Sequence, residues 1–420
     1  MENIQNTGVQ AYLVGGAVRD KLLGRPVADH DWVVIGATPE MLIEQGYQQI
    51  GNDFPCFLHP ETKDEYALAR TERKSGKGHT GFVCDFSPEV TLEEDLSRRD
   101  LTINAIALTL EGKYVDPFNG RADLNNKVLR HVSESFSDDP LRVLRVARFA
   151  ARYATLDFQV HPNTLELMKH LVNNGELAEL TPERVWKEMS RALTEPRPSE
   201  FFRVLRACGA LEVLMPELDC LFGVPQPPQH HPEVDTGDHV MMVVDIARER
   251  FDDLIVTWAA LMHDLGKGLT PEEEWPRHIR HEIKGVPLVE KVCECYKVPK
   301  DFRTLAKLVS EHHLRCHKLL EMRPKSVLKL LEALDGFRRP ERVRYFAQAC
   351  EADARGRLGL EQRDYPQSQL LIEYNQVAID TNIKPLLSEG YEGLKLAEKI
   401  RRLRLGSIKR YMAQYKIAPQ

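Results

Sequence analysis

The stretch that decides the fold is residues 12–35, YLVGGAVRDKLLGRPVADHDWVVI. Its two short apolar runs, Tyr12–Val14 and Trp32–Ile35, are typical of buried strands. Between them, Ala17–Leu23 has helical character and ends at Gly24, with a proline two residues further on, which is a usual helix stop. The stretch therefore predicts a strand, a glycine turn, a helix and a second strand.

The double glycine Gly15-Gly16 lies where the first strand meets the helix. Glycines permit close approach of a ligand to the backbone, and the free N–H groups at a helix start attract phosphate. Arg19, one turn into the helix, could add a bidentate phosphate contact. A plain strand-to-helix turn would use the same glycines, so the pair is weak evidence when taken alone.

The second feature is the acidic pair Asp29-His30-Asp31, which directly precedes the apolar strand. Residues i and i+2 of a strand face the same side, so both carboxylates could hold one or two Mg²⁺ ions. Such ions would activate an attacking hydroxyl and stabilise departing pyrophosphate. A solvated loop is the alternative reading of this motif, and Glu65 and Glu72 are unsupported candidates for a third carboxylate.

Three further motifs narrow the interpretation. They are 96–105 (LSRRDLTINA), 116–120 (DPFNG) and 139–149 (DPLRVLRVARF). With the glycine turn and the acidic pair, they resemble the polymerase-β-like nucleotidyltransferases. The chain is most similar to bacterial class II CCA-adding enzymes that carry an HD domain, and the similarity covers its whole length. Asp138 stands where that family has Glu, a change that keeps the charge.

The resemblance implies a fold, an activity and a nucleotide site. It implies Mg²⁺-dependent, template-independent addition and repair of the 3′-terminal CCA of tRNA from CTP and ATP, with release of pyrophosphate. Asp29 and Asp31 would be the catalytic Mg²⁺ ligands of this reaction. The expected nucleotide-binding residues are Gly16, Arg19, Arg99, Asp139, Arg142, Arg145 and Arg148. Of these, Arg99 is assigned to the triphosphate or ribose by resemblance alone.

Asp139 and Arg142 could select the base without a nucleic-acid template. Cytosine and adenine each present an amino donor beside a ring-nitrogen acceptor, whereas uracil and guanine present the reverse. A carboxylate only accepts and a guanidinium only donates, so the pair would accept C and A. The two residues have the spacing of one helical turn. Arg145 and Arg148 continue at steps of three and could follow a triphosphate, although an exposed helix face is the alternative.

A second set of metal-ligand residues lies in the C-terminal half: His239, His263, Asp264 and Asp353. Two imidazoles and two carboxylates suit a borderline divalent metal such as Ni²⁺, Co²⁺, Mn²⁺ or Zn²⁺. The order resembles HD-domain metal phosphohydrolases, with His263 and Asp264 catalytic and Ni²⁺ the first expectation. Further histidines of that superfamily fall near His281, His312 and His313. The resemblance implies phosphatase, 2′-nucleotidase and 2′,3′-cyclic phosphodiesterase activity.

The expected fold is α+β: a mixed-sheet nucleotidyltransferase head followed by an all-α neck, body and tail with an HD domain. The predicted domains are 1–138 (head), 139–225 (neck and body), 226–360 (HD phosphohydrolase) and 361–420 (helical tail). Residues 57–59 and 66–69 are strand candidates. The charged stretch 70–80 (RTERKSGKGHT) predicts a loop, and the Pro-rich stretch 221–232 (LFGVPQPPQHHP) predicts a linker.

Bulk properties fit a cytoplasmic protein. The chain has 420 residues, 42% of them hydrophobic and 29% charged, and no apolar run is long enough for a membrane span. Its eight scattered cysteines, without a CxxC pair, indicate reduced thiols. The net charge of −6 does not favour nucleic acid. Binding of the tRNA acceptor end must then depend on local basic patches, such as the one formed by residues 399–404. An ordinary solvated helix face is an equally good explanation of that patch. A monomer and a homodimer are both open.

Three alternatives remain at this point. A poly(A) polymerase shares the glycine turn, the acidic pair and the arginine motifs. An HD phosphohydrolase could carry a nucleotide-binding head without catalysis. A non-catalytic RNA-binding or nucleotide-sensing protein is disfavoured by the intact carboxylates of both sites.

Overall fold

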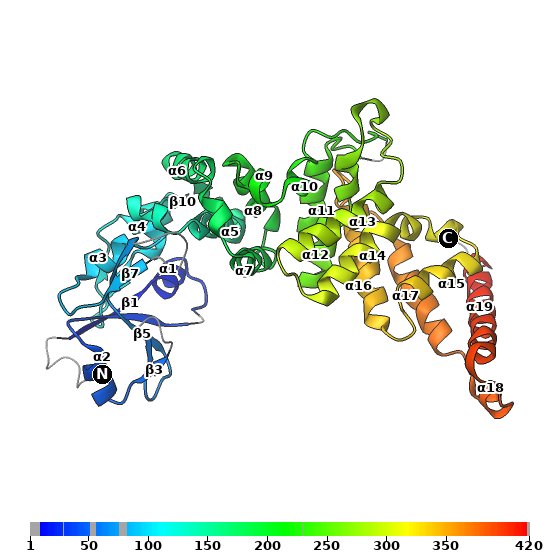
Figure 1. Ribbon diagram of the computed structural model, residues 1–420, viewed down its shortest axis with the longest axis horizontal. Coiled ribbons are helices and arrows are strands. Elements are labelled where there is room, and N and C mark those ends of the chain that lie inside the picture. Colours follow the sequence, from blue (N-terminus) through cyan, green and yellow to red (C-terminus); the bar gives the residue numbers. More distant parts are fainter. Residues whose placement is uncertain (1–8, 28, 51–55, 75–81, 230, 418–420) are drawn as a thin grey trace. The chain divides into compact units, whose positions relative to one another are not determined.

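The computed structural model describes residues 9–417 except 28, 51–55, 75–81 and 230, without the side chains of 72–84 and 415–417. The chain forms two compact units (Figure 1). Unit 1 comprises Met1–Met189 and Glu200–Leu214, and unit 2 comprises Ser190–Ser199 and Met215–Gln420. The four-part division expected from the sequence stays a prediction.

The centre of unit 1 is a seven-stranded mixed sheet. Its strands, in spatial order, are β3 (Gln48–Ile50), β4 (Cys56–Leu58), β5 (Glu65–Leu68), β2 (Asp31–Ile35), β1 (Gln10–Val14), β8 (Ala107–Leu108) and β9 (Tyr114–Val115). Strand β1 pairs antiparallel with β2, and β2 pairs parallel with β5, so the two strands of the opening stretch are central. The expected mixed-sheet head is confirmed.

Both faces of β2 are covered, which explains its uninterrupted apolar sequence. Val34 packs in a cluster with Leu42 and Phe57. Its neighbour Val33 belongs to a different cluster, with Leu96 and Ala105. Because successive side chains of a strand point to opposite faces, these are the two sides of one sheet.

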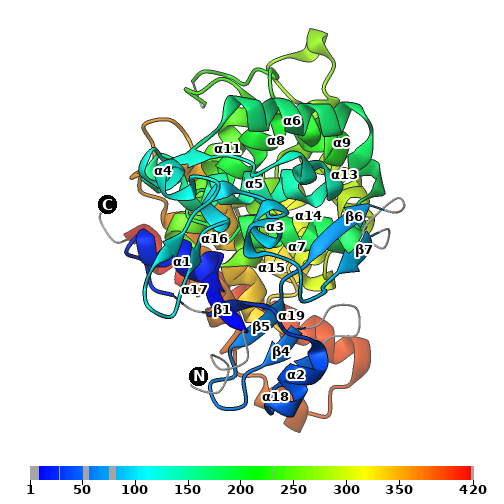
Figure 2. The ribbon, with the colours of Figure 1, turned by 90° about the vertical axis from the view of Figure 1, so that its left-hand side faces the viewer.

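The predicted loop at 70–80 is partly wrong. Thr71–Lys74 forms strand β6, which pairs antiparallel with β7 (Phe82–Asp85) in a separate two-stranded sheet (Figure 2). Pairing along this hairpin satisfies backbone groups that a loop would leave to water. Residues 75–81 lie outside the described part of the chain.

Helices surround this sheet and continue beyond it. The helices that begin in unit 1 are α1 (Gly16–Leu22), α2 (Pro39–Glu44), α3 (Leu92–Ser97), α4 (Gly120–Asn125), α5 (Leu141–Tyr153), α6 (Pro162–Asn173), α7 (Pro182–Ala192) and α9 (Ala210–Leu214). Helix α8 (Pro198–Ala207) begins just before unit 1 resumes at Glu200. Strand β10 (Val128–Leu129) pairs in parallel with β11 (Gln159–Val160), so β11 is a short strand beyond residue 139, where only helices were expected.

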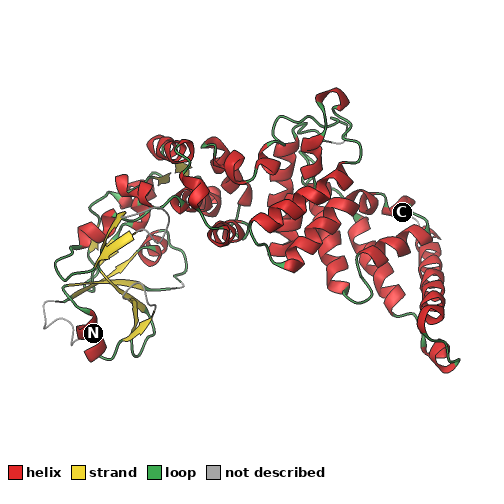
Figure 3. Ribbon diagram, viewed as in Figure 1, coloured by secondary structure: helices red, strands yellow, loops and turns green. Residues whose placement is uncertain are grey.

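Unit 2 is helical (Figure 3). Its helices are α10 (Pro216–Asp219), α11 (Thr236–Phe251), α12 (Leu254–Met262), α13 (His281–Cys295), α14 (Lys300–His317), α15 (Pro324–Ala333), α16 (Pro340–Arg355), α17 (Pro366–Ile379), α18 (Lys384–Ser388) and α19 (Gly393–Ile417). Helices α11, α12, α14 and α16 pack against one another and enclose buried Trp258. None of the helices in the described residues is both long and apolar enough to cross a membrane.

The Pro-rich segment 221–232 differs from the expected linker. It lies inside unit 2, where Leu221 and Gln226 are buried. The carbonyl of Pro225 accepts from His278 Nε2 at 2.8 Å, and Lys267 Nζ donates to the Gln226 side chain. The prolines restrict the backbone of this segment, but they do not require it to be exposed, so it can pack against the rest of unit 2.

Candidate functional site

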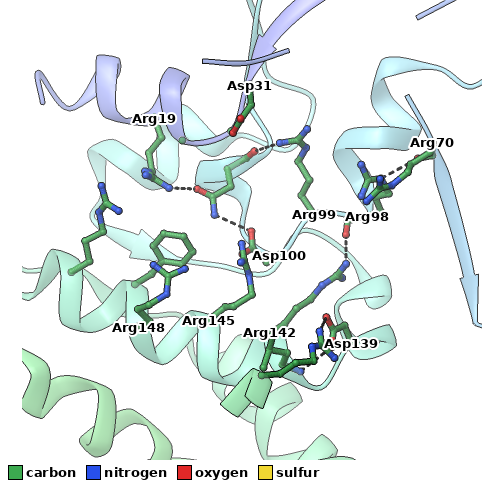
Figure 4. A pocket seen from close by; sticks show the side chains of 17 residues that line it. Arg19, Asp31, Arg70, Arg98, Arg99, Asp100, Asp139, Arg142, Arg145 and Arg148 are labelled. Carbon is green, nitrogen blue, oxygen red and sulfur yellow. Dashed lines mark hydrogen bonds and ion pairs between the residues drawn. The ribbon is translucent and has the colours of Figure 1, made fainter. Parts of the chain in front are cut away.

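Unit 1 contains a cavity of about 570 Å³ into which the sheet and three helices project charged side chains (Figure 4). We call it the arginine cavity. Its polar and glycine lining residues are Gly15, Gly16, Arg19, Asp31, Arg70, Arg98, Arg99, Asp100, Asn104, Asp139, Arg142, Arg145, Arg148, Arg152 and Arg184. Nine arginines against three aspartates make the cavity a strong anion site.

The glycine turn forms one wall of this cavity. Gly15 has φ +67°, a left-handed conformation that favours glycine, and its carbonyl accepts from Arg19 N at 3.1 Å. A Cβ on Gly15 would lie 3.1 Å from Arg99 NH1, so a side chain here would press on that guanidinium. Buried Arg19 donates to Asn104 Oδ1 at 2.6 Å, which fixes its head beside the turn.

The acidic pair is only partly assembled. Asp31 is the first residue of β2 and lines the cavity. Asp29 precedes the strand, is exposed and lies outside the described lining residues. Desolvation raises the pKa of Asp31 against the opposing effect of Arg99, and the Asp29 charge raises it further. Glu65 is the register partner of Asp31 on β5, whereas the side chain of Glu72 is not described.

Asp95, in the first turn of α3, organises two of the arginines. It is fully buried and accepts from Arg98 NH2 at 2.5 Å and Arg99 NH2 at 3.1 Å. It also accepts from the backbone N–H of Arg70 at 3.3 Å. Although burial raises the pKa of Asp95, the two guanidinium groups lower it below its ordinary value, so it stays ionised. One acidic side chain thus orients three arginine positions.

Asp100 performs the same role for the helix that follows. Its Oδ1 accepts from Leu101 N at 2.8 Å and Asn104 Nδ2 at 2.9 Å. Its Oδ2 accepts from Arg145 Nε at 2.8 Å and NH2 at 2.7 Å. Burial raises the pKa of Asp100, but Arg145 and these hydrogen bonds lower it more. Arg148, one turn further along, pairs with buried Glu188 at 2.7 Å.

Asp139 and Arg142 are close in sequence, but Arg142 lies in helix α5 whereas Asp139 lies in the extended segment before it. Helix α5 begins at Leu141, and Asp139 is extended with φ −121° and ψ 105°. A residue before proline avoids the helical region, which explains why Asp139 stays outside. Its Oδ2 accepts from Arg184 NH2 at 2.8 Å, while Arg142 donates to the carbonyls of Ser135 and Arg98. Both side chains line the cavity, but in the described structure each has other partners.

Several lining residues were not assigned from sequence. Arg98, Asp100 and Asn104 stood within the quoted 96–105 motif, so the motif was the signal that could have found them. Arg152 lies three residues past the 139–149 stretch. Arg184 is far from every quoted motif, and no sequence signal pointed to it.

The second candidate site is in unit 2, where four histidines and two aspartates converge. We call His239, His263, Asp264, His281, His313 and Asp353 the histidine–aspartate centre; all six are buried. His239 Nε2 lies 3.2 Å from Asp353 Oδ1, and His263 Nε2 lies 3.1 Å from Asp264 Oδ2. Helices α11, α13, α14 and α16, together with the turn after α12, bring these residues together. The four predicted ligands therefore meet.

Each histidine of the centre is oriented by a backbone carbonyl. His239 Nδ1 lies 3.0 Å from Gly356 O, and His263 Nδ1 lies 2.7 Å from Ala260 O. His281 and His313 use their Nδ1 atoms in the same way, on the carbonyls of His278, Val309 and Ser310. A carbonyl can only accept, so each Nδ1 carries a proton, and in the neutral imidazole the lone pair is on Nε2. The four Nε2 atoms face the carboxylates, where each could bind a metal in the neutral form.

Such a convergence of acceptors fits a cation. His239 Nε2, His263 Nε2 and Asp264 Oδ1 are buried and make no hydrogen bond. Burial lowers the pKa of His263, yet the Asp264 and Asp353 carboxylates raise it overall, so the centre attracts positive charge. Metal bonds of about 2.1 Å place adjacent ligand atoms roughly 3.0–3.5 Å apart, as several pairs here are. His239, His263 and Asp353 could hold one divalent ion.

A second group of ligand atoms adjoins the first. Asp264 Oδ1 lies 3.3 Å from His281 Nε2 and 3.7 Å from His313 Nε2, and the two histidine nitrogens are 3.4 Å apart. Burial lowers the pKa of His313 to about 3, so its imidazole is neutral and able to bind a metal. His312, also considered from the sequence, lies beside Glu311 instead.

A smaller cavity of about 160 Å³ opens onto the centre. Its lining includes Lys267, Arg277 and Arg357 beside Asp264 and Asp353. Lys267 Nζ lies 2.5 Å from Asp264 Oδ2, and Arg357 NH2 lies 3.2 Å from Asp353 Oδ1. Cations next to buried metal-ligand groups suit an anionic ester such as a phosphate.

The basic patch on α19 is partly neutralised. Arg401 pairs with Glu332 at 2.6 Å, and Arg402 pairs with Glu398 at 2.7 Å. Arg404 stacks over Phe337 at 4.0 Å. The role of 399–404 in binding RNA stays a prediction.

Models of known families match three regions of the chain. Residues 11–130 match the "Poly A polymerase head domain", and 157–221 match the "Probable RNA and SrmB- binding site of polymerase A". Residues 236–353 match the "HD domain", which contains all six residues of the histidine–aspartate centre. Fold and sites together define a nucleotidyltransferase head joined to an HD domain.

Full-length relatives are more specific. The chain is 57% identical over 403 residues to the multifunctional CCA protein of Pseudomonas aeruginosa PAO1, covering 96% of this chain and 98% of that protein. It is 58% identical over 407 residues to the multifunctional CCA protein of Ectopseudomonas mendocina, covering 97% and 99%. The chain therefore belongs to the family of multifunctional CCA proteins, the bacterial class II CCA-adding tRNA nucleotidyltransferases with an HD domain.

Solved structures share the fold. An apo CCA-adding enzyme superimposes with a TM-score of 0.65 at 21% identity, covering 96% of this chain and 87% of that one. The Bacillus stearothermophilus CCA-adding enzyme in complex with CTP gives 0.64 at 22%, covering 98% and 91%. The Thermotoga maritima CCA-adding enzyme complexed with tRNA gives 0.61 at 19%, covering 98% and 92%.

Proposed function

We propose that this protein adds and repairs the 3′-terminal CCA of tRNA from CTP and ATP, releasing pyrophosphate. The observation that carries the proposal is the arginine cavity, in which the glycine turn, Asp31 and nine arginines meet. Such a cavity can bind the anionic triphosphate and the anionic end of an RNA, and it can form hydrogen bonds with a base. Family membership and likeness to solved CCA-adding enzymes support the same reaction.

Within the cavity the residues divide the work. Arg19 in α1 and the N–H groups of the glycine turn suit the triphosphate. Arg99, Arg145 and Arg148, held by Asp95, Asp100 and Glu188, add further phosphate or ribose contacts from fixed positions. Asp139 and Arg142, which line the same cavity, would select the base by accepting from the amino group and donating to the ring nitrogen of C or A.

Asp31 and Asp29 would hold the divalent ion, for which Mg²⁺ is the expectation. The raised pKa of Asp31, caused by desolvation and by the Asp29 charge, fits a carboxylate awaiting a cation. When bound, the ion would lower the pKa of the attacking hydroxyl and neutralise pyrophosphate. The chain itself supplies the arginines that orient the triphosphate before transfer.

The test uses a tRNA transcript without CCA, Mg²⁺, and either single nucleotides or CTP with ATP. We expect growth by three nucleotides with CTP and ATP, none with UTP or GTP, and no growth for Asp31→Asn. Long A tails on unrelated RNA would instead indicate a poly(A) polymerase. No growth with any nucleotide would leave only the HD phosphohydrolase.

A second activity is favoured by the histidine–aspartate centre. We propose metal-dependent hydrolysis of phosphate esters, including 2′,3′-cyclic phosphate and 2′-phosphate, with Ni²⁺ as the first candidate and Co²⁺ or Mn²⁺ as others. His239, His263, Asp264 and Asp353 would hold the ion, which supplies an activated water. Lys267 and Arg357 are placed to bind the phosphate oxygens and keep the ester at the mouth of the centre.

Paired variants separate the two activities. Asp264→Asn should abolish hydrolytic opening of 2′,3′-cyclic AMP to the adenosine monophosphate with Ni²⁺ while leaving CCA addition intact. Asp31→Asn should do the reverse. Loss of both activities in either variant would contradict two independent sites, and a wild-type protein without hydrolysis in Ni²⁺, Co²⁺ or Mn²⁺ would overturn this second proposal.

A further inference from the structure

One buried carboxylate at the histidine–aspartate centre has no role in the arrangement described so far. Glu233 lies before α11 and outside the part of the chain that matches the HD domain. Its side chain is only 4% exposed. Burial of a carboxylate is unfavourable unless hydrogen bonds hold it, so its partners indicate what it does.

The partners of Glu233 come from three segments. Its Oε1 lies 3.0 Å from His239 Nδ1 and 3.0 Å from His231 Nδ1. Its Oε2 accepts from the backbone N–H of Leu358 at 3.3 Å. Leu358 directly follows Arg357, which lines the cavity at the centre. The Glu233 carboxylate therefore contacts the Pro-rich segment 221–232 through His231, the expected metal ligand His239, and the backbone after helix α16.

These atoms do not form another metal site, although His231, Glu233 and His239 are close enough to be considered as one. His239 Nδ1 also faces Gly356 O at 3.0 Å. A carbonyl oxygen can only accept, so this nitrogen carries a proton and cannot bind a metal. The N–H is shared between the carbonyl and the Glu233 carboxylate.

We infer that Glu233 is a positioning residue for the metal centre, acting through His239. A carboxylate on the N–H side of a ligand histidine fixes the tautomer and ring orientation and makes the opposite nitrogen a better donor. His239 Nε2, 3.2 Å from Asp353 Oδ1, is that opposite nitrogen. The inference rests on the proposed metal-dependent hydrolase, and it extends the functional centre to a segment before the HD domain.

The test is titration of full-length, metal-free protein with Ni²⁺ by calorimetry, and with Co²⁺ by visible absorption. We expect Glu233→Gln to weaken Ni²⁺ binding about 10- to 100-fold, the usual effect of removing such a partner. The Co²⁺ spectrum should also change, because the orientation of His239 changes. Glu233→Asp, which keeps the charge on a shorter side chain, should recover part of the affinity.

Glu351→Gln is the matched control. Glu351 is a partly buried glutamate of the same unit that pairs with Arg250 and Arg355 and touches no ligand histidine. It should bind Ni²⁺ as wild type does, and all variants should keep the wild-type thermal unfolding curve as well as CCA addition, which together report that both units fold. Wild-type affinity in Glu233→Gln, or equal weakening in Glu351→Gln, would overturn the inference. Absence of Ni²⁺ and Co²⁺ binding in wild type would instead refute the proposed hydrolase centre.

Discussion

Replacement of Asp100 by Asn tests whether the arginines of the cavity act from fixed positions. Asn keeps an oxygen for Leu101 N and Asn104 Nδ2, but it turns an amino group toward the Arg145 guanidinium. Two charge-assisted hydrogen bonds are lost, each worth about 1.5–3 kcal/mol when well shielded. The Arg145 side chain is 34% exposed, so water replaces part of the loss, and we expect a net effect of about 2 kcal/mol.

If Arg145 contacts the nucleotide in the transition state, that energy appears in catalysis. A loss of about 2 kcal/mol corresponds to a roughly 30-fold fall in kcat/KM for CTP and ATP. The assay is single-nucleotide addition to tRNA that lacks either the whole CCA or only its terminal A, with initial rates over a range of nucleotide concentrations.

The matched control for this experiment is Asp123→Asn. Asp123 is another buried aspartate of unit 1; it holds Arg130 at 3.0 Å and Thr102 at 2.7 Å and does not line the cavity. It should alter stability but leave kcat/KM within about twofold. Equal losses in both variants, or none in Asp100→Asn, would refute the view that Asp100 positions a functional arginine.

Three further predictions concern specificity, packing and pH. Arg184→Ala removes the partner of Asp139 Oδ2, so misincorporation of UTP or GTP in a primer-extension assay should rise by about tenfold. The control is Arg206→Ala, which removes an arginine of α8 that does not line the cavity. Unchanged selectivity in Arg184→Ala would exclude Arg184 from base selection. Gly266→Ala places a Cβ 2.0 Å from the carbonyl oxygen of His281, which should destabilise the protein by about 3 kcal/mol and weaken Ni²⁺ binding in calorimetry. Gly406→Ala is the control and should do neither, because its Cβ would lie 3.5 Å from the nearest atom, Arg410 NH1. The folded-state pKa values of Asp95 and Asp100 lie below their unfolded values, so the stability that the two carboxylates contribute is present above about pH 3.9 and is lost as pH falls below it. In urea unfolding between pH 5 and 3, the free energy of unfolding should therefore depend less steeply on pH for Asp95→Asn than for wild type. An unchanged slope would contradict the assignment.

The parts of the fold that followed from sequence were those with a local cause. The strand–turn–helix of residues 12–35 is visible because apolar runs and glycines are adjacent in the chain. The ligands His263 and Asp264 were visible as a dipeptide, and the motif at 96–105 contained Asp100 before its role was known. Each of these signals lies within a few residues.

What sequence could not supply were the contacts between distant residues. Arg184 meets Asp139 across 45 positions, and Glu233 meets Leu358 across 125. The hairpin formed by 71–74 and 82–85 was mistaken for a loop, because its charged sequence resembles one and only pairing makes it a strand. Asp139 was placed on the helix by its spacing to Arg142, whereas Pro140 keeps it off.

The carbonyl anchors of the four histidines limit how unit 2 can be redesigned. Side-chain substitutions elsewhere leave those oxygens in place, since every residue type contributes the same backbone group. Changing how this centre binds metal therefore requires exchange of the ligands themselves or of side-chain partners such as Glu233, because the carbonyl anchors persist in every side-chain variant.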